Sequence, residues 1–95
     1  MVRHIVFFKL NENTPANKEA LREKLLTLKP HIGELKALEV GINFSESERA
    51  YDLALVSDFE DEAALKRYAT HPYHLDVIAY IKEVCSDTKV VDYRY

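Results

Sequence analysis

The chain has 95 residues, 47% of them hydrophobic, with 13 basic against 16 acidic side chains and a formal net charge of −3. This length predicts one domain, residues 1–95, with a single core of modest size. Because the sequence contains no basic stripe of the kind that displaces counterions from phosphates, we expect no nucleic-acid partner. No apolar run approaches the ~20 residues that cross a bilayer, so we expect no membrane partner either.

The cysteine content and the N-terminus predict a cytoplasmic protein. Cys85 is the only cysteine, so no disulfide can form within the chain, and a reducing compartment is expected. Its place in an apolar helical pattern favours a buried thiol over a nucleophile. The apolar run within the opening stretch MVRHIVFFKL is too short for a signal peptide, and no small-residue cleavage site follows it.

The first two predicted elements are a strand and a helix. Residues 2–10 alternate, and both faces of the resulting strand are apolar. One face carries His4, Val6, Phe8 and Leu10, and the other carries Ile5 and Phe7. The helix follows, with Thr14 as its N-cap, Pro15 in its first turn and Gly33 as its terminator. Its buried stripe consists of Leu21, Leu25, Leu28 and Ile32.

The second half of the chain predicts a hairpin, two short helices and a last strand. Strands over residues 35–44 and 51–59 flank the polar loop SESER. Asp61 caps a helix that turns Leu65 and Tyr68 inward, and another helix begins at Pro72. The stripe of this last helix is Leu75, Ile78, Ile81 and Cys85, and TKVVDYRY forms the final strand.

The order β-α-β-β-α-α-β predicts an α+β ferredoxin-like protomer, in which helices cover one face of a four-stranded antiparallel sheet. Apolar residues nevertheless recur on both faces. An uncovered apolar area of ~400 Å² exceeds what a soluble monomer tolerates. Burying this area stabilises a complex by about 10 kcal/mol, before the free-energy cost of association is subtracted. We therefore predict a homodimer formed by sheet-to-sheet packing. The residues concerned are Ile5, Phe7, Leu38, Val40, Ile42 and Val56.

Four stretches of the chain, RHIVFFKL, EVGINFS, YDLALVSDFEDEAALKRYATHPYH and VVDYRY, together resemble the stress-responsive A/B-barrel domain family, also called Dabb. The most specific part is Tyr-x-x-His-Pro-x-His at residues 68–74. The resemblance runs over essentially the whole chain. It implies a ferredoxin-like protomer that pairs into a dimeric α+β barrel.

The resemblance also implies candidate catalytic residues. The plant olivetolic acid cyclase of this family closes a linear polyketide by aldol condensation without metal or organic cofactor. By resemblance, its catalytic histidine falls on His74, its catalytic tyrosine on Tyr68 and a further pocket histidine on His4. Another pocket histidine of that enzyme falls on Leu53, so the base and the acid are retained but the same substrate is not implied.

These residue types suit proton transfer next to a carbonyl. A neutral histidine can remove the proton, and a tyrosine hydroxyl can stabilise the enolate that forms. Tyr68 and His74 are six residues apart, and the proline between them lets two helices meet so that both side chains share one space, with His4 below. Either Asp52 or Asp92 orients one of the histidines. The expected ligand pocket contains Phe8, Leu53, Leu75 and Ile78.

Structural alternatives stay open for each of these residues. Tyr68 can be a core aromatic with a satisfied hydroxyl, and His74 can make a structural hydrogen bond. His71 is expected to cap a helix, and His31 to complement a helix dipole. The spacing of His71 and His74 occurs in metal sites, but no cysteine or carboxylate lies at a ligand interval, so we predict no metal. No motif for a nucleotide cofactor is present.

Three functions are consistent with the sequence. The first is a cofactor-free cyclase or isomerase that acts on a small apolar carbonyl compound by general acid–base catalysis. The second is a binding protein that holds a small hydrophobic ligand without converting it. The third is a structural, stress-associated dimer whose pocket is filled by its own side chains.

Overall fold

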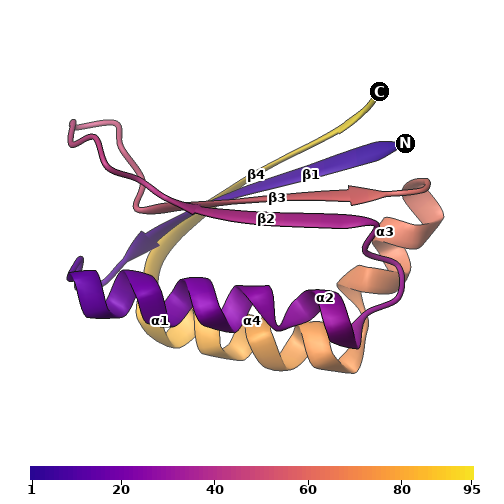
Figure 1. Cartoon of the computed structure of the whole chain (residues 1–95), viewed down its shortest axis with the longest axis horizontal. Helices are drawn as coiled ribbons and strands as arrows, with labels where there is room; N and C mark the ends of the chain where they lie inside the picture. Colours follow the sequence, from indigo (N-terminus) through magenta and orange to yellow (C-terminus); the bar gives the residue numbers. More distant parts are fainter.

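The computed structural model describes all 95 residues (Figure 1). Its elements are β1 (Val2–Leu10), α1 (Pro15–Leu26), α2 (Leu28–His31), β2 (Ala37–Ile42), β3 (Leu53–Phe59), α3 (Glu62–Ala69), α4 (Pro72–Val84) and β4 (Cys85–Arg94). The strands form one antiparallel sheet in the order β2-β3-β1-β4, and the helices lie on one side of it (Figure 1). The predicted ferredoxin-like α+β protomer is confirmed. None of the helices combines the length and apolar character that a membrane-spanning segment requires.

Capping side chains set where the helices begin, as the sequence predicted. The Thr14 hydroxyl accepts a hydrogen bond from the Asn17 N–H at 3.1 Å, at the start of α1. The Asp61 carboxylate accepts one from the Ala64 N–H at 2.8 Å, at the start of α3. Each bond satisfies an N–H group that has no partner inside its helix.

The first helical region is broken at Thr27, where one helix was predicted. The Thr27 hydroxyl donates to the Lys24 carbonyl at 2.6 Å, and α2 begins at the next residue. The predicted apolar stripe is confirmed across this break, since all four of its members are fully buried. They are Leu21, Leu25, Leu28 and Ile32.

The predicted stripe of α4 is partly wrong. Leu75 is 51% exposed, whereas Val77 is almost fully buried. Tyr73 and Ile81 pack against the core beside Val77, so the buried stripe recurs at spacings of four from Tyr73. Leu75 lies two residues from both Tyr73 and Val77, which turns it about 200° away from them. Cys85 is not helical but begins β4.

The register of the sheet divides its side chains between two faces. We call the face beneath the helices the covered face and the opposite one the open face. On the covered face, Val6 lies opposite Leu55, and both are buried. On the open face, Phe7 and Val91 remain exposed. Of the apolar residues predicted for the two faces, Leu38, Val40 and Ile42 share the covered face, and Ile5, Phe7 and Val56 share the open one.

Candidate functional site

A cavity of about 510 Å³ lies between the covered face and the helices. Of its 17 lining residues, 11 are hydrophobic, which favours an apolar ligand held in place by a few polar groups. Strands β1, β3 and β4 form one wall, and α1, α2, α3 and α4 each contribute side chains to the other.

Three side chains from separate elements meet at one end of this cavity. Tyr68 comes from the last turn of α3, His74 from the first turn of α4 and His4 from β1. The Tyr68 ring centroid lies 4.2 Å from that of His74 and 6.1 Å from that of His4. The joint at Pro72 therefore brings Tyr68 and His74 together, and β1 places His4 beside them.

The Tyr68 hydroxyl is free to contact a ligand. The residue is only 2% exposed, and this burial raises the pKa of the phenol above its usual value. The hydroxyl therefore stays protonated at neutral pH and can donate a hydrogen bond. Every fully buried polar side-chain atom in the protein has a hydrogen-bond partner. The Tyr68 oxygen has no such partner, so it is not fully buried and reaches the surface of the cavity that Tyr68 lines. The alternative of a hydroxyl satisfied within the core is wrong.

His74 is held in one tautomer. Its Nδ1–H donates to the Ala69 carbonyl at 3.0 Å. Since a carbonyl only accepts, Nδ1 carries the proton, and Nε2 keeps an unshared electron pair. Burial lowers the pKa of the imidazole; the hydrogen bond to the Ala69 carbonyl partly opposes this shift, and the nearby His4 and His71 add to it, so the pKa lies below its ordinary value. The ring is therefore neutral at pH 7, the form that a general base requires.

Asp92, rather than Asp52, orients a histidine. His4 Nδ1 bonds to the Asp92 carboxylate from the neighbouring strand β4. Asp52 instead accepts hydrogen bonds from the Leu10 N–H at 2.7 Å and from Asn13 Nδ2 at 2.8 Å. Asp52 thus fixes the end of β1 and the turn after it, away from the histidines.

The predicted pocket residues divide evenly. Phe8 and Ile78 line the cavity, whereas Leu53 and Leu75 lie outside its lining. Leu53 is fully buried in the core cluster at the start of β3 and lies outside the cavity lining. Leu75 points to solvent for the helical reason given above.

The opposite end of the cavity was not predicted from the sequence. Lys82 of α4 and the first residues of β4 line it. The signal was present, because His74, Ile78 and Lys82 recur at intervals of four and so share one face of α4. The β4 contribution could not be inferred while Cys85 was assigned to a helix. These β4 residues are Cys85, Ser86, Asp87, Thr88 and Val90.

The remaining histidines have structural partners. His71 caps α4, and its Nδ1 accepts from the Tyr73 N–H at 3.1 Å, as predicted. His31 stacks on the Tyr73 ring, with centroids 4.0 Å apart. Nowhere in the chain do three or more histidine, cysteine, aspartate or glutamate side chains converge as a metal site would need.

Comparisons with known proteins agree with this architecture. The family described as the stress responsive A/B barrel domain matches residues 2–95. An uncharacterized protein of Streptomyces coelicolor is 34% identical over 98 residues, with 100% of both chains covered. A dimeric ferredoxin-like protein of Thermobifida fusca superimposes with a TM-score of 0.85 at 30% identity, over 99% of this chain and 90% of its own. A hydroxynitrile lyase from Passiflora edulis superimposes with a TM-score of 0.83 at 20% identity, over 97% of this chain and 90% of its own. This similarity shows a shared fold alone.

Proposed function

This chain belongs to the stress-responsive A/B barrel domain family, and we propose that it is a homodimeric enzyme that transfers a proton on a small apolar carbonyl compound. His74 acts as the base and Tyr68 as the acid, and the chain's own side chains suffice for the step. The observation that carries the proposal is a free imidazole nitrogen and an unpaired phenol hydroxyl at one end of a largely apolar cavity.

The chemistry follows from the two protonation states. His74 Nε2 takes a proton from the carbon next to the carbonyl, and the Tyr68 O–H donates a hydrogen bond to the oxygen on which negative charge develops. The enolate then attacks a second carbonyl of the same molecule, which closes a ring, and the alkoxide that forms takes the proton back from His74. Alternatively, the enolate recovers the proton from His74 at another carbon. The first outcome is a cyclisation and the second an isomerisation.

His4 supplies a further polar contact beside this pair. Because an ionised carboxylate only accepts hydrogen bonds, His4 Nδ1–H donates to the Asp92 carboxylate, which leaves His4 Nε2 for the ligand. The imidazole is largely buried, with 14% of its side chain exposed. His4 is thus an oriented third group that positions the substrate from the sheet side.

The homodimer is supported by the open face of the sheet. Phe7, Val91, Tyr93 and Tyr95 are each more than 40% exposed, and exposed apolar side chains that gather on one face favour an interaction site there. The Thermobifida fusca protein that shares this fold is described as dimeric. Packing of two open faces against each other would bury these side chains without obstructing the cavity on the covered face.

Exchange of carbon-bound protons with solvent tests the catalytic step without knowledge of the natural substrate. A series of linear methyl ketones of increasing chain length is incubated with the protein in deuterated water, and loss of the α-proton signal is followed by NMR. We expect faster exchange for the ketones that fit the cavity. Removing a general base typically costs a factor of 10²–10⁴, so His74→Ala should reduce exchange roughly to the uncatalysed rate.

Matched variants separate catalysis from folding. His31→Ala removes a histidine that lies outside the cavity and should leave exchange unchanged. Tyr68→Phe should slow exchange while ketone binding persists. Equal exchange rates for the wild type and His74→Ala, at saturating ketone, would contradict the assignment of His74 as the base.

Binding without conversion is the second candidate, and the predominantly apolar lining of the cavity favours it. A protein of this kind would bind the longer ketones saturably but would not accelerate exchange. Phe8→Ala would then weaken binding, because Phe8 lines the cavity from β1. His74→Ala would have little effect on the affinity.

A further inference from the structure

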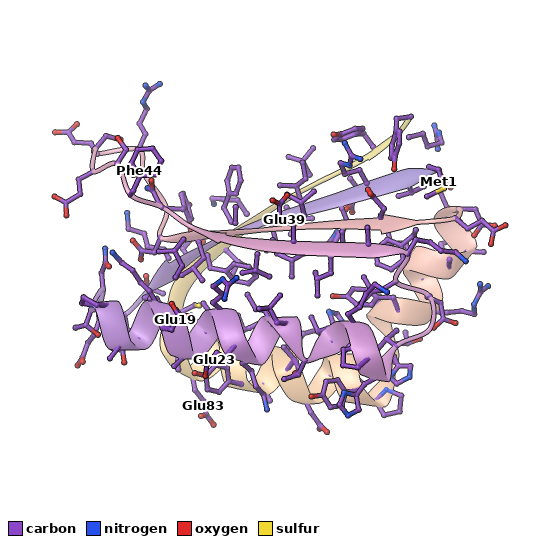
Figure 2. The ribbon with its side chains drawn as sticks, in the orientation of Figure 1. Met1, Glu19, Glu23, Glu39, Phe44 and Glu83 are labelled. Atoms are coloured by element: carbon purple, nitrogen blue, oxygen red, sulfur yellow. The ribbon has the colours of Figure 1, made fainter.

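The connection between β2 and β3 projects from the sheet. We call residues 43–52 the β2–β3 arm. It rises on the side of the sheet opposite the helices, that is, beside the open face (Figure 1). Phe44 lies on this arm (Figure 2), and its side chain is 98% exposed, the highest value among the exposed large hydrophobic residues.

Hydrogen bonds hold the arm in a defined shape. Asn43 Nδ2 donates to the Tyr51 carbonyl at 2.8 Å, and Asn43 Oδ1 accepts from the Ser45 N–H at 2.9 Å. The backbone N–H of Asn43 donates to the Asp52 carbonyl at 2.9 Å, and the Asp52 N–H donates to the Phe8 carbonyl of β1 at 2.8 Å. The base of the arm is therefore tied to the sheet on both sides of Phe44.

The arm and the open face enclose a shallow hollow of about 380 Å³. Phe44 and Arg49 of the arm line it together with Phe7 of β1 and Ala54 of β3. The Phe7 and Tyr51 ring centroids are 6.1 Å apart, so aromatic surface continues from the sheet to the base of the arm. Phe44 thus extends the apolar surface of the open face instead of standing alone on the protein.

We propose that the β2–β3 arm is a dimerisation arm, in which Phe44 packs against a second copy of this chain. This inference rests on the homodimer proposed above and adds a specific anchor residue to it. A partner seated on the open face would meet the arm, because the arm rises on that side of the sheet (Figure 1). In a two-fold dimer the contact is made twice, once by each arm.

The backbone that carries Phe44 is preorganised for association. A backbone segment that is already held in one shape loses less conformational entropy on association than a flexible loop does. Asn43 fixes the backbone on both sides of Phe44 through its amide. Aromatic residues of this kind carry a disproportionate share of binding free energy at protein interfaces.

Dilution series by sedimentation velocity on the full chain test the proposal. Truncation of an anchor residue typically weakens binding by tenfold or more. In a two-fold dimer, one substitution removes the Phe44 contact from both arms. We therefore expect Phe44→Ser to raise the dimer dissociation constant by roughly tenfold or more, with an unchanged circular dichroism spectrum. Asn43→Ala, which frees the arm but keeps Phe44, should raise the dissociation constant by a smaller factor.

Leu75→Ser provides the matched control. It removes another exposed apolar side chain, from α4 on the side of the helices, and should leave the dissociation constant unchanged. A dimeric wild type with the same dissociation constant for Phe44→Ser would overturn the role of the arm and leave the homodimer intact. A wild type that stays monomeric at every concentration would overturn both.

Discussion

The two faces of the sheet place neighbouring residues of the same strands in different surroundings. On the covered face, Val6 and Phe8 of β1 are almost completely buried beneath the helices. On the open face, Phe7 between them is 43% exposed, and Val91 of the neighbouring strand is 59% exposed. All four side chains are apolar, so the difference comes from the strand alternation and from the helices on one side only.

Under the proposed function, this difference separates chemistry from assembly within a small domain. The covered face carries the cavity and the cluster formed by His4, Tyr68 and His74. The open face carries the apolar surface that we assign to the dimer. Because neighbouring residues of one strand point to opposite faces, substitutions one position apart test the two surfaces independently.

The largest expected effect concerns the core beneath the covered face. Leu21 is fully buried in α1 outside the cavity lining, and its replacement by alanine should lower the free energy of unfolding by about 2–5 kcal/mol. Urea denaturation followed by circular dichroism measures the change. Leu75→Ala, at a half-exposed site, should stay within about 0.5 kcal/mol. Equal losses for the two variants would show that the helices do not pack on the sheet as described.

A pair of neighbouring valines on β4 tests the assignment of the faces. Val91 lies on the open face, and Val90, at 54% exposure, lies on the covered side and lines the cavity. Charges of like sign brought together in an interface cost several kcal/mol, so Val91→Asp should raise the dimer dissociation constant by roughly 100-fold. Val90→Asp should leave it unchanged. A dimer that tolerates aspartate at residue 91 but not at residue 90 would reverse the assignment.

The smallest expected effect on stability belongs to Tyr68→Phe. The hydroxyl has no partner within the protein, so its removal should change the free energy of unfolding by less than about 0.5 kcal/mol. The proton-exchange activity should fall in the same variant. A loss of about 1 kcal/mol or more would indicate that the hydroxyl makes a structural hydrogen bond and is not available to a ligand.

Local signals in the sequence were sufficient for most of the elements of the fold. Thr14, Asp61 and Pro72 mark helix starts through chemistry that depends only on nearby residues, and the structure begins its helices where they indicate. The break at Thr27 was not predicted, because an apolar stripe continues across it and hides the interruption.

The site was predictable only in part, because the rest depends on long-range packing. The choice between Asp52 and Asp92 requires the register of β1 against β4, which no local pattern specifies. The placement of Leu75 depends on how α4 is rotated about its axis, and Val77 rather than Leu75 is the residue that packs inward. The resemblance located Tyr68 and His74, and the proline joint explains why they meet.

The central claim is that His74 is a neutral base held in the Nδ1–H tautomer. Burial places the pKa of His74 in the folded protein below the ordinary value of 6.5. As the pH falls, His74 is therefore protonated in the unfolded chain before it is protonated in the folded protein. The free energy of unfolding should therefore fall as the pH decreases from about 6.5 through the pKa of the folded state, and His74→Ala should remove this contribution. The same variant assigns the His74 resonances.

An NMR titration of the His74 imidazole, with nitrogen shifts to report the tautomer, tests this claim most directly. We predict a midpoint below 6.5 and a proton on Nδ1 throughout the neutral range. A midpoint at or above 6.5, or a neutral ring protonated on Nε2, would contradict the account. His74 would then not be the base, and the cavity would lose its proposed catalytic step.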